Sequence, residues 1–187
     1  MNQWARLNNP YNDDKVMTAC GLFGMMDTSG RRFSGGDVIT AIANMHERSN
    51  GLGGGFAVYG LYPQYADHYA LHIMYLNEEA RREAECLLQG GFRVDLAEPV
   101  PTRKTRGIVD PPLLWRYFVE VRLEDHQISH DDYVLAQVMA INTGVRDAFV
   151  FSSGKNMGVF KGVGYPEDLA NYFRLDDYQG YLWTAHG

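Results

Sequence analysis

The chain has 187 residues, of which 45% are hydrophobic and 21% charged, a composition typical of one globular domain with a sizeable core. Its formal net charge of −6 argues against a general nucleic-acid binder, because binding phosphates takes a basic surface. No run of about eighteen apolar residues could span a membrane, and two cysteines cannot build a disulfide framework. We therefore expect a cytoplasmic protein, in a compartment that keeps thiols reduced.

The N-terminal stretch, residues 1–19, is polar and lacks the apolar centre of a secretory signal. We expect it to be an extended leader, and residues 20–187 to form one domain. Residues 20–26 begin with Cys20-Gly21 and continue mostly with apolar side chains, which predicts a buried strand. The glycine after the cysteine indicates that another part of the chain approaches closely.

A first helix is predicted over residues 35–47, where apolar side chains recur at helical spacing. Ser34 is its expected N-cap, with Asp37 three residues later as in a capping box. The following loop, residues 49–55, contains four glycines. It has neither the spacing of a dinucleotide fingerprint nor the lysine of a P-loop.

Residues 56–62 and 69–76 are rich in aromatic and β-branched residues and are predicted to pair as neighbouring strands. Asn77 is the expected cap of a helix that runs through residue 89 and that two glycines would terminate. Cys86, beside two leucines in this helix, is expected to lie in the core.

Strands are also predicted over residues 92–96 and 115–123, joined by a proline-bearing connection. Ser129 and Asp132 repeat the capping pattern and predict a second long helix, which Gly144 would end.

Residues 148–152 and 157–161 are predicted to form a hairpin. A short helix that begins at Pro166 and a strand over residues 181–185 complete the chain. Because the helices are separated by strand pairs of antiparallel type, the order favours an α+β fold rather than a doubly wound parallel sheet.

Four segments resemble one family, in the order in which that family carries them. Cys20-Gly21-Leu22-Phe23-Gly24 resembles the start of a class II glutamine amidotransferase domain, and residues 46–55, HERSNGLGGG, resemble its second glycine-rich segment. Residues 159–164, VFKGVG, and 182–186, LWTAH, resemble segments late in the amidotransferase half of glutamate synthases. The chain is thus similar over residues 20–187 to a family of N-terminal-nucleophile hydrolases.

The resemblance implies a four-layer αββα sandwich, incomplete at its C-terminus, with glutaminase activity. Cys20 would be the nucleophile and its own α-amine, with a pKa of about 7.7–8.0, the general base. The thiolate would attack the side-chain amide of glutamine, release ammonia and leave a glutamyl thioester for water to hydrolyse. Glutamine and an ammonia-accepting synthase domain or subunit are the implied partners, and the glutamate synthase-like acceptor would be 2-oxoglutarate.

The chain departs from the family pattern near both of its ends. The family's arginine for the α-carboxylate of glutamine, its downstream Asn-Gly pair for the oxyanion and its acid for the α-amine have no counterpart in residues 20–187. Asn50-Gly51 could imitate the oxyanion pair, but it comes earlier in the chain than the family places that pair. We therefore expect the N-terminal part of a longer domain that hydrolyses glutamine poorly by itself. While residues 1–19 remain attached, Cys20 has no free amine, so catalysis requires cleavage of the leader.

Three residues besides Cys20 are expected near the substrate. Gly53 and Gly54 are chosen because clustered glycines permit close backbone approach, and His186 because the resemblance places it in the active-site strand.

No metal site is predicted, because the pairs His68/His72 and His126/His130 have no third ligand at a clear spacing. Two cysteines also cannot hold an iron–sulfur cluster, so no cofactor is expected in this chain.

Three alternatives to a glutamate synthase-like function stay open. The ammonia acceptor could be a sugar phosphate, phosphoribosyl diphosphate, aspartate or a methylated amine, since a partner domain would choose it. The chain could be a non-catalytic regulatory or scaffold module of the same fold, or an N-terminal-nucleophile hydrolase that cuts another amide. Clustered tyrosines around residues 59–75 are compatible with sheet packing or with an oligomer interface.

Overall fold

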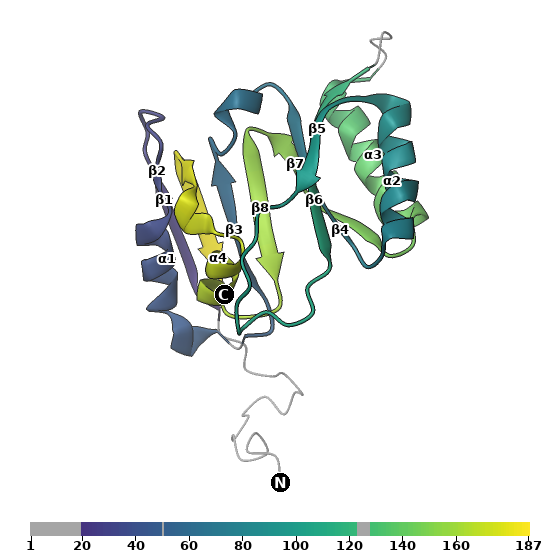
Figure 1. Ribbon diagram of the computed structural model, residues 1–187. Helices are drawn as coiled ribbons and strands as arrows, with labels where there is room; N and C mark the ends of the chain where they lie inside the picture. Colours follow the sequence, from purple (N-terminus) through teal and green to yellow (C-terminus); the bar gives the residue numbers. More distant parts are fainter. Residues whose placement is uncertain (1–19, 50, 123–127) are drawn as a thin grey trace, which may run out of the picture.

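The computed structural model describes residues 20–49, 51–122 and 128–187 (Figure 1). Two four-stranded antiparallel sheets and four α-helices in this part of the chain make a mixed fold, which confirms the α+β class predicted from the order of elements. The expected leader, residues 1–19, lies outside the described residues.

The first sheet has its strands in the order β1-β10-β3-β8, and every neighbouring pair is antiparallel. Buried and more exposed residues alternate along β10, β3 and β8, so one face of this sheet lies in the core. Its strands are β1 (Leu22–Met26), β10 (Leu182–His186), β3 (Gly54–Tyr59) and β8 (Met157–Gly162).

The second sheet has the order β5-β6-β4-β7 and is antiparallel throughout. A separate short antiparallel pair is formed by β2, which follows β1 in the sequence, and β9, which precedes β10. The bounds of these strands are β5 (Phe92–Pro99), β6 (Leu113–Val121), β4 (Tyr69–Tyr75), β7 (Ala148–Lys155), β2 (Phe33–Ser34) and β9 (Gln179–Gly180).

The helices pack in two pairs, one pair with each sheet. Figure 1 shows α1 and α4 beside the first sheet and α2 and α3 side by side against the second, with the strands between the two pairs. None of the helices in the described residues is long and apolar enough to cross a membrane. The helices are α1 (Gly36–Ala43), α2 (Glu78–Gly91), α3 (His130–Gly144) and α4 (Pro166–Tyr172).

Two of the three predicted helix caps are confirmed. The Asn77 side chain accepts a hydrogen bond from the Ala80 N–H at 2.8 Å, and the Ser129 hydroxyl accepts one from the Asp132 N–H at 3.1 Å. Each side chain satisfies a backbone donor that has no partner within the helix.

The prediction of Ser34 as the cap of α1 is wrong by one residue. The cap is Gly35, which has no capping side chain, although the Ser34 hydroxyl accepts a hydrogen bond from the Gly36 N–H at 3.3 Å. A Cβ at Gly35 would lie 2.6 Å from the ring of the fully buried Trp183. Tertiary packing against that ring therefore requires glycine where a capping side chain would otherwise stand.

The two long helices end at the predicted glycines, α2 at Gly91 and α3 at Gly144, although these glycines are the last helical residues and the caps are Phe92 and Val145. Cys86 is exposed rather than in the core. The buried side of α2 contains Ala84 and Leu88. Cys86 is two positions from each of them, and residues two apart lie on opposite sides of a helix, so its side chain faces away from the core.

Both predicted strand pairs are wrong, because the chain crosses between the sheets at each turn. β3 belongs to the first sheet and β4 to the second, and β7 belongs to the second sheet and β8 to the first. The turn from β7 to β8 contains Asn156 in the left-handed region, with φ of 50°. β7 and β8 therefore contact each other between the two sheets rather than within one ladder.

The two sheets are joined by a pair of buried polar side chains. His72 on β4 lies directly opposite Ser152 on β7, and both bond to Val159 on β8. The His72 Nδ1–H donates to the Val159 carbonyl at 3.1 Å, and the Val159 N–H donates to the Ser152 hydroxyl at 2.9 Å. The Tyr62 hydroxyl donates to His72 Nε2 at 2.8 Å and so completes the hydrogen bonding of the imidazole.

Burial of His72 makes the folding stability sensitive to acid. Removal from water lowers the pKa of His72 from 6.5 to about 4, so between these values the unfolded chain binds a proton that the folded chain does not. We expect the free energy of unfolding to fall by roughly 3 kcal/mol as the pH falls from 6.5 to 4. Urea unfolding across this range measures it. H72Q, whose amide can both donate and accept, should lose that part of the pH dependence, and an unchanged slope would contradict the assignment.

Candidate functional site

Cys20 lies exposed, one residue before the backbone contact that joins the two ends of the described chain. The Gly21 N–H donates to the Gly187 carbonyl at 2.7 Å, and the Gly187 N–H donates to the Gly21 carbonyl at 3.0 Å. This reciprocal pair extends the β1–β10 ladder, in which Leu22 is opposite His186. The thiol therefore projects from a fixed strand end that solvent can reach.

Gly21 is buried, and residues at the end of α1 and just after this helix cover it. A Cβ at this position would lie 3.0 Å from the Cβ of Met45 and 3.4 Å from the side chain of Ile42. The close approach predicted from the glycine after Cys20 is thus confirmed, whereas the prediction of a buried strand is wrong, because four of the five residues of β1 are exposed. The close approach anchors the residue next to the thiol against the helix.

The structure brings Gly54 and His186 to the same end of the first sheet as Cys20. A Cβ at Gly54 would lie 3.0 Å from the His186 carbonyl oxygen and 3.4 Å from Pro166 Cγ. His186 is opposite Leu22 on one side and Gly55 on the other. Its backbone is part of the sheet, whereas the residue itself is exposed.

Gly53 precedes β3, and its neighbours are less close. The nearest atom to a Cβ there is the Gly162 carbonyl oxygen at 3.8 Å, an ordinary contact. Of the two glycines expected near the substrate, Gly54 is therefore the one whose lack of a side chain the packing requires. The substrate role of both glycines and of His186 stays a prediction.

A histidine–glutamate pair near this end of the sheet was not found from the sequence. His46 Nδ1 lies 2.5 Å from Glu167 Oε1, and the His46 ring stacks on Tyr165 with 4.0 Å between ring centroids. Met45, which packs against Gly21, directly precedes His46, and Pro166, which packs against Gly187, directly precedes Glu167. The pair thus borders the strand end that carries Cys20.

The same pair fastens the glycine-rich loop to the start of α4. Gly51 has φ of +69°, and a Cβ there would lie 3.2 Å from the Tyr165 ring. The His46 and Glu167 side chains are 44% and 32% exposed, so solvent screens their attraction, and we expect less than about 1 kcal/mol of stability from it. The two residues are 121 positions apart, a separation at which no sequence spacing signals a contact.

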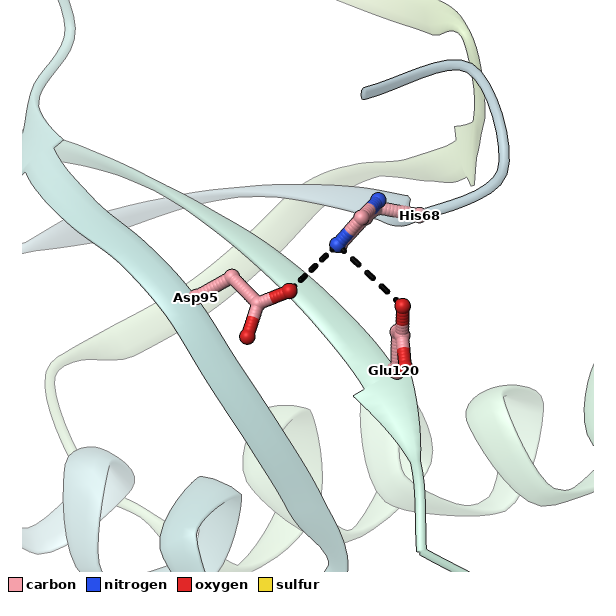
Figure 2. Close-up of side chains that lie close together, drawn as sticks. All are labelled: His68, Asp95 and Glu120. Atoms are coloured by element: carbon pink, nitrogen blue, oxygen red, sulfur yellow. Dashed lines mark hydrogen bonds and ion pairs between the residues drawn. The ribbon is translucent and has the colours of Figure 1, made fainter. Parts of the chain in front are cut away.

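A second polar cluster lies on the other sheet and contains His68, for which the sequence offered no third ligand. Figure 2 shows the imidazole of His68 between the carboxylates of Asp95 and Glu120. His72, its expected companion, is instead buried against β8, and His126 lies outside the described residues.

We expect an added methyl group to separate the roles of the two neighbouring glycines. G54A forces Cβ against the His186 carbonyl and should lower the free energy of unfolding by about 1–3 kcal/mol. G53A meets only an ordinary contact and should change it by less than about 0.5 kcal/mol. Urea denaturation of both variants measures the difference, and equal effects would show that Gly54 is not closely packed.

Comparison with known proteins finds a long match to one archaeal protein of unstated activity. No protein-family profile matches the chain. Over 178 residues, 92% of this chain, it is 53% identical to an uncharacterized protein of Archaeoglobus fulgidus. The match covers 47% of that protein, so this chain spans about half the length of the relative. The chain is therefore similar to part of a longer archaeal protein.

Proposed function

We propose that the chain is the glutaminase part of a class II glutamine amidotransferase, similar to the amidotransferase half of glutamate synthase, with Cys20 as its nucleophile. The observation that carries the proposal is the position of this cysteine. Its thiol is exposed at the start of β1, and the next residue is held by Met45 and by both hydrogen bonds to Gly187. A nucleophile needs this combination of access and fixed orientation.

The proposed reaction uses two groups of the same residue, the thiol and the α-amine of Cys20. Once residues 1–19 are removed, the α-amine of Cys20 has a pKa of about 7.7–8.0 and can take the proton of the thiol near neutral pH. The sulfur then forms a bond to the amide carbon of glutamine. The C–N bond breaks, ammonia leaves with the transferred proton, and water hydrolyses the thioester to glutamate.

Glycine at positions 54 and 187 lets Pro166 pack closely at the strand end beside Cys20. Both backbone groups of Gly187 are paired with Gly21, so this packing shapes the site rather than offering hydrogen bonds to a substrate. We assign Gly53, Gly54 and His186 to the walls of the glutamine site, and the His46–Glu167 pair to holding the glycine-rich loop beside it.

The proposed fold type is the αββα sandwich of N-terminal-nucleophile hydrolases, and the two antiparallel sheets between helix pairs support it. The ammonia would pass to a synthase domain or subunit in the cytoplasm, where a reduced thiol persists. Such an arrangement separates the release of ammonia from its use, so this chain would require no redox cofactor of its own.

Covalent capture tests the proposal without depending on turnover. A chain that begins at Cys20, released from a cleavable fusion, is treated with diazo-oxo-norleucine, a glutamine-shaped electrophile, and its intact mass is followed. We expect one adduct on Cys20, formed at least about tenfold faster than in the chain that begins at Met1, because only the former has the amine base.

The second cysteine supplies the matched control. Cys86 is also exposed. Diazo-oxo-norleucine should therefore still label C86S but not C20A. Iodoacetamide, which does not resemble glutamine, should label both thiols of the parent chain. Equal labelling of Cys20 and Cys86 by diazo-oxo-norleucine, or equal rates with and without residues 1–19, would refute the assigned mechanism.

A further inference from the structure

Three side chains with metal-binding atoms converge across three neighbouring strands of the second sheet, away from the strand that follows Cys20. His68 directly precedes β4, Asp95 lies on β5 and Glu120 on β6 (Figure 2). His68 Nε2 is 2.5 Å from Asp95 Oδ2 and 3.4 Å from Glu120 Oε1, and all three atoms lie within 4.8 Å of one another.

The sheet register explains why they meet. Tyr69 is opposite Val119, so the preceding His68 comes beside Glu120. Val94 is also opposite Val119, but Leu96 is opposite Phe118, which leaves Asp95 as the extra residue of a β-bulge. A bulge redirects a side chain without disturbing the ladder on either side. Here it brings the Asp95 carboxylate to the row that contains His68 and Glu120.

Arg93 contacts both carboxylates and shares Asp95 Oδ2 with the imidazole, so it is a cation that competes with any metal ion at this cluster. Its Nε lies 2.9 Å from Asp95 Oδ1 and its Nη2 2.7 Å from Glu120 Oε2, with a further 3.1 Å contact from Nη2 to Asp95 Oδ2. Asp95 Oδ2 and Glu120 Oε1 remain directed at His68 Nε2.

We propose that His68, Asp95 and Glu120 bind one divalent transition-metal ion, such as Zn²⁺ or Mn²⁺, through one imidazole nitrogen and two carboxylate oxygens. A single proton on Nε2 can bridge to one carboxylate at a time, whereas a cation between the three atoms interacts with all of them. Mixed nitrogen and oxygen ligands suit these ions better than Ca²⁺ or Mg²⁺. The His68 side chain is 16% exposed and that of Glu120 41%, which leaves access for water as a fourth ligand.

The ion would serve stability rather than attack on an amide, because the cluster is on the second sheet and Cys20 precedes the first. It would tie the segment before β4 to β5 and β6. Within the described residues, His68 Nδ1 is buried and has no hydrogen-bond partner. Metal-binding histidines usually donate from their second nitrogen, so we expect micromolar rather than nanomolar affinity.

Metal titration of the full chain tests the site. Because thiolates also bind Zn²⁺, the parent is C20S/C86S. We expect one equivalent of Zn²⁺ in isothermal titration calorimetry, a Co²⁺ absorption spectrum without sulfur charge transfer, and a higher melting temperature with Zn²⁺. H68N should weaken Zn²⁺ binding at least about tenfold, and so should D95N and E120Q. The last two variants provide the test if H68N does not fold.

Matched variants decide whether binding is local. H130N removes an exposed histidine and D67N an exposed acid beside the cluster, and neither should change the affinity. R93Q removes a competing cation and should leave Zn²⁺ binding equal or tighter. No saturable binding to the parent, binding that survives in D95N and E120Q, or an equal loss in H130N would overturn the proposal.

Discussion

The free edge of β8 is the constraint around which the two sheets are arranged. β8 ends the first sheet, so the backbone groups on its outer side have no neighbouring strand. An exposed strand edge is a liability, and a buried one costs free energy unless its groups are paired. His72 and Ser152 pair both groups of Val159, and they are the two buried polar residues of the described part of the chain. Side chains of one sheet thus take the place of a strand in the other.

The same joint holds the turns that cross between the sheets. Asn156, between β7 and β8, accepts the Gly60 N–H on its carbonyl at 2.8 Å and the Tyr62 N–H on its side chain at 2.8 Å. Tyr62 in turn bonds to His72. The exit of β3, the turn before β8 and the imidazole on β4 are therefore one connected network, in which loss of a member leaves a buried polar group unpaired.

The strand β10 connects the ends of the described chain at the opposite side of the first sheet. It lies between β1 and β3, and its Trp183 is fully buried and donates from Nε1 to the Phe33 carbonyl at 3.3 Å. Through this strand Gly187 reaches Gly21, and residues from α1, β3 and α4 come to border Cys20. The candidate site is thus made of segments that no local stretch of sequence contains.

The sequence alone determined the class of fold, most of the helices and strands, and the caps at Asn77 and Ser129. These features depend on interactions between residues close in the chain, such as the cap hydrogen bonds, which reach only three residues. The sequence also singled out Cys20 and the glycine after it. Only the tertiary structure decided that β3 and β4, and β7 and β8, belong to different sheets, that Cys86 is exposed, and that His46 meets Glu167 and His68 meets Asp95. Strand pairing and side-chain clusters depend on which faces are buried together across long separations, and periodicity within one segment carries no information about its partner.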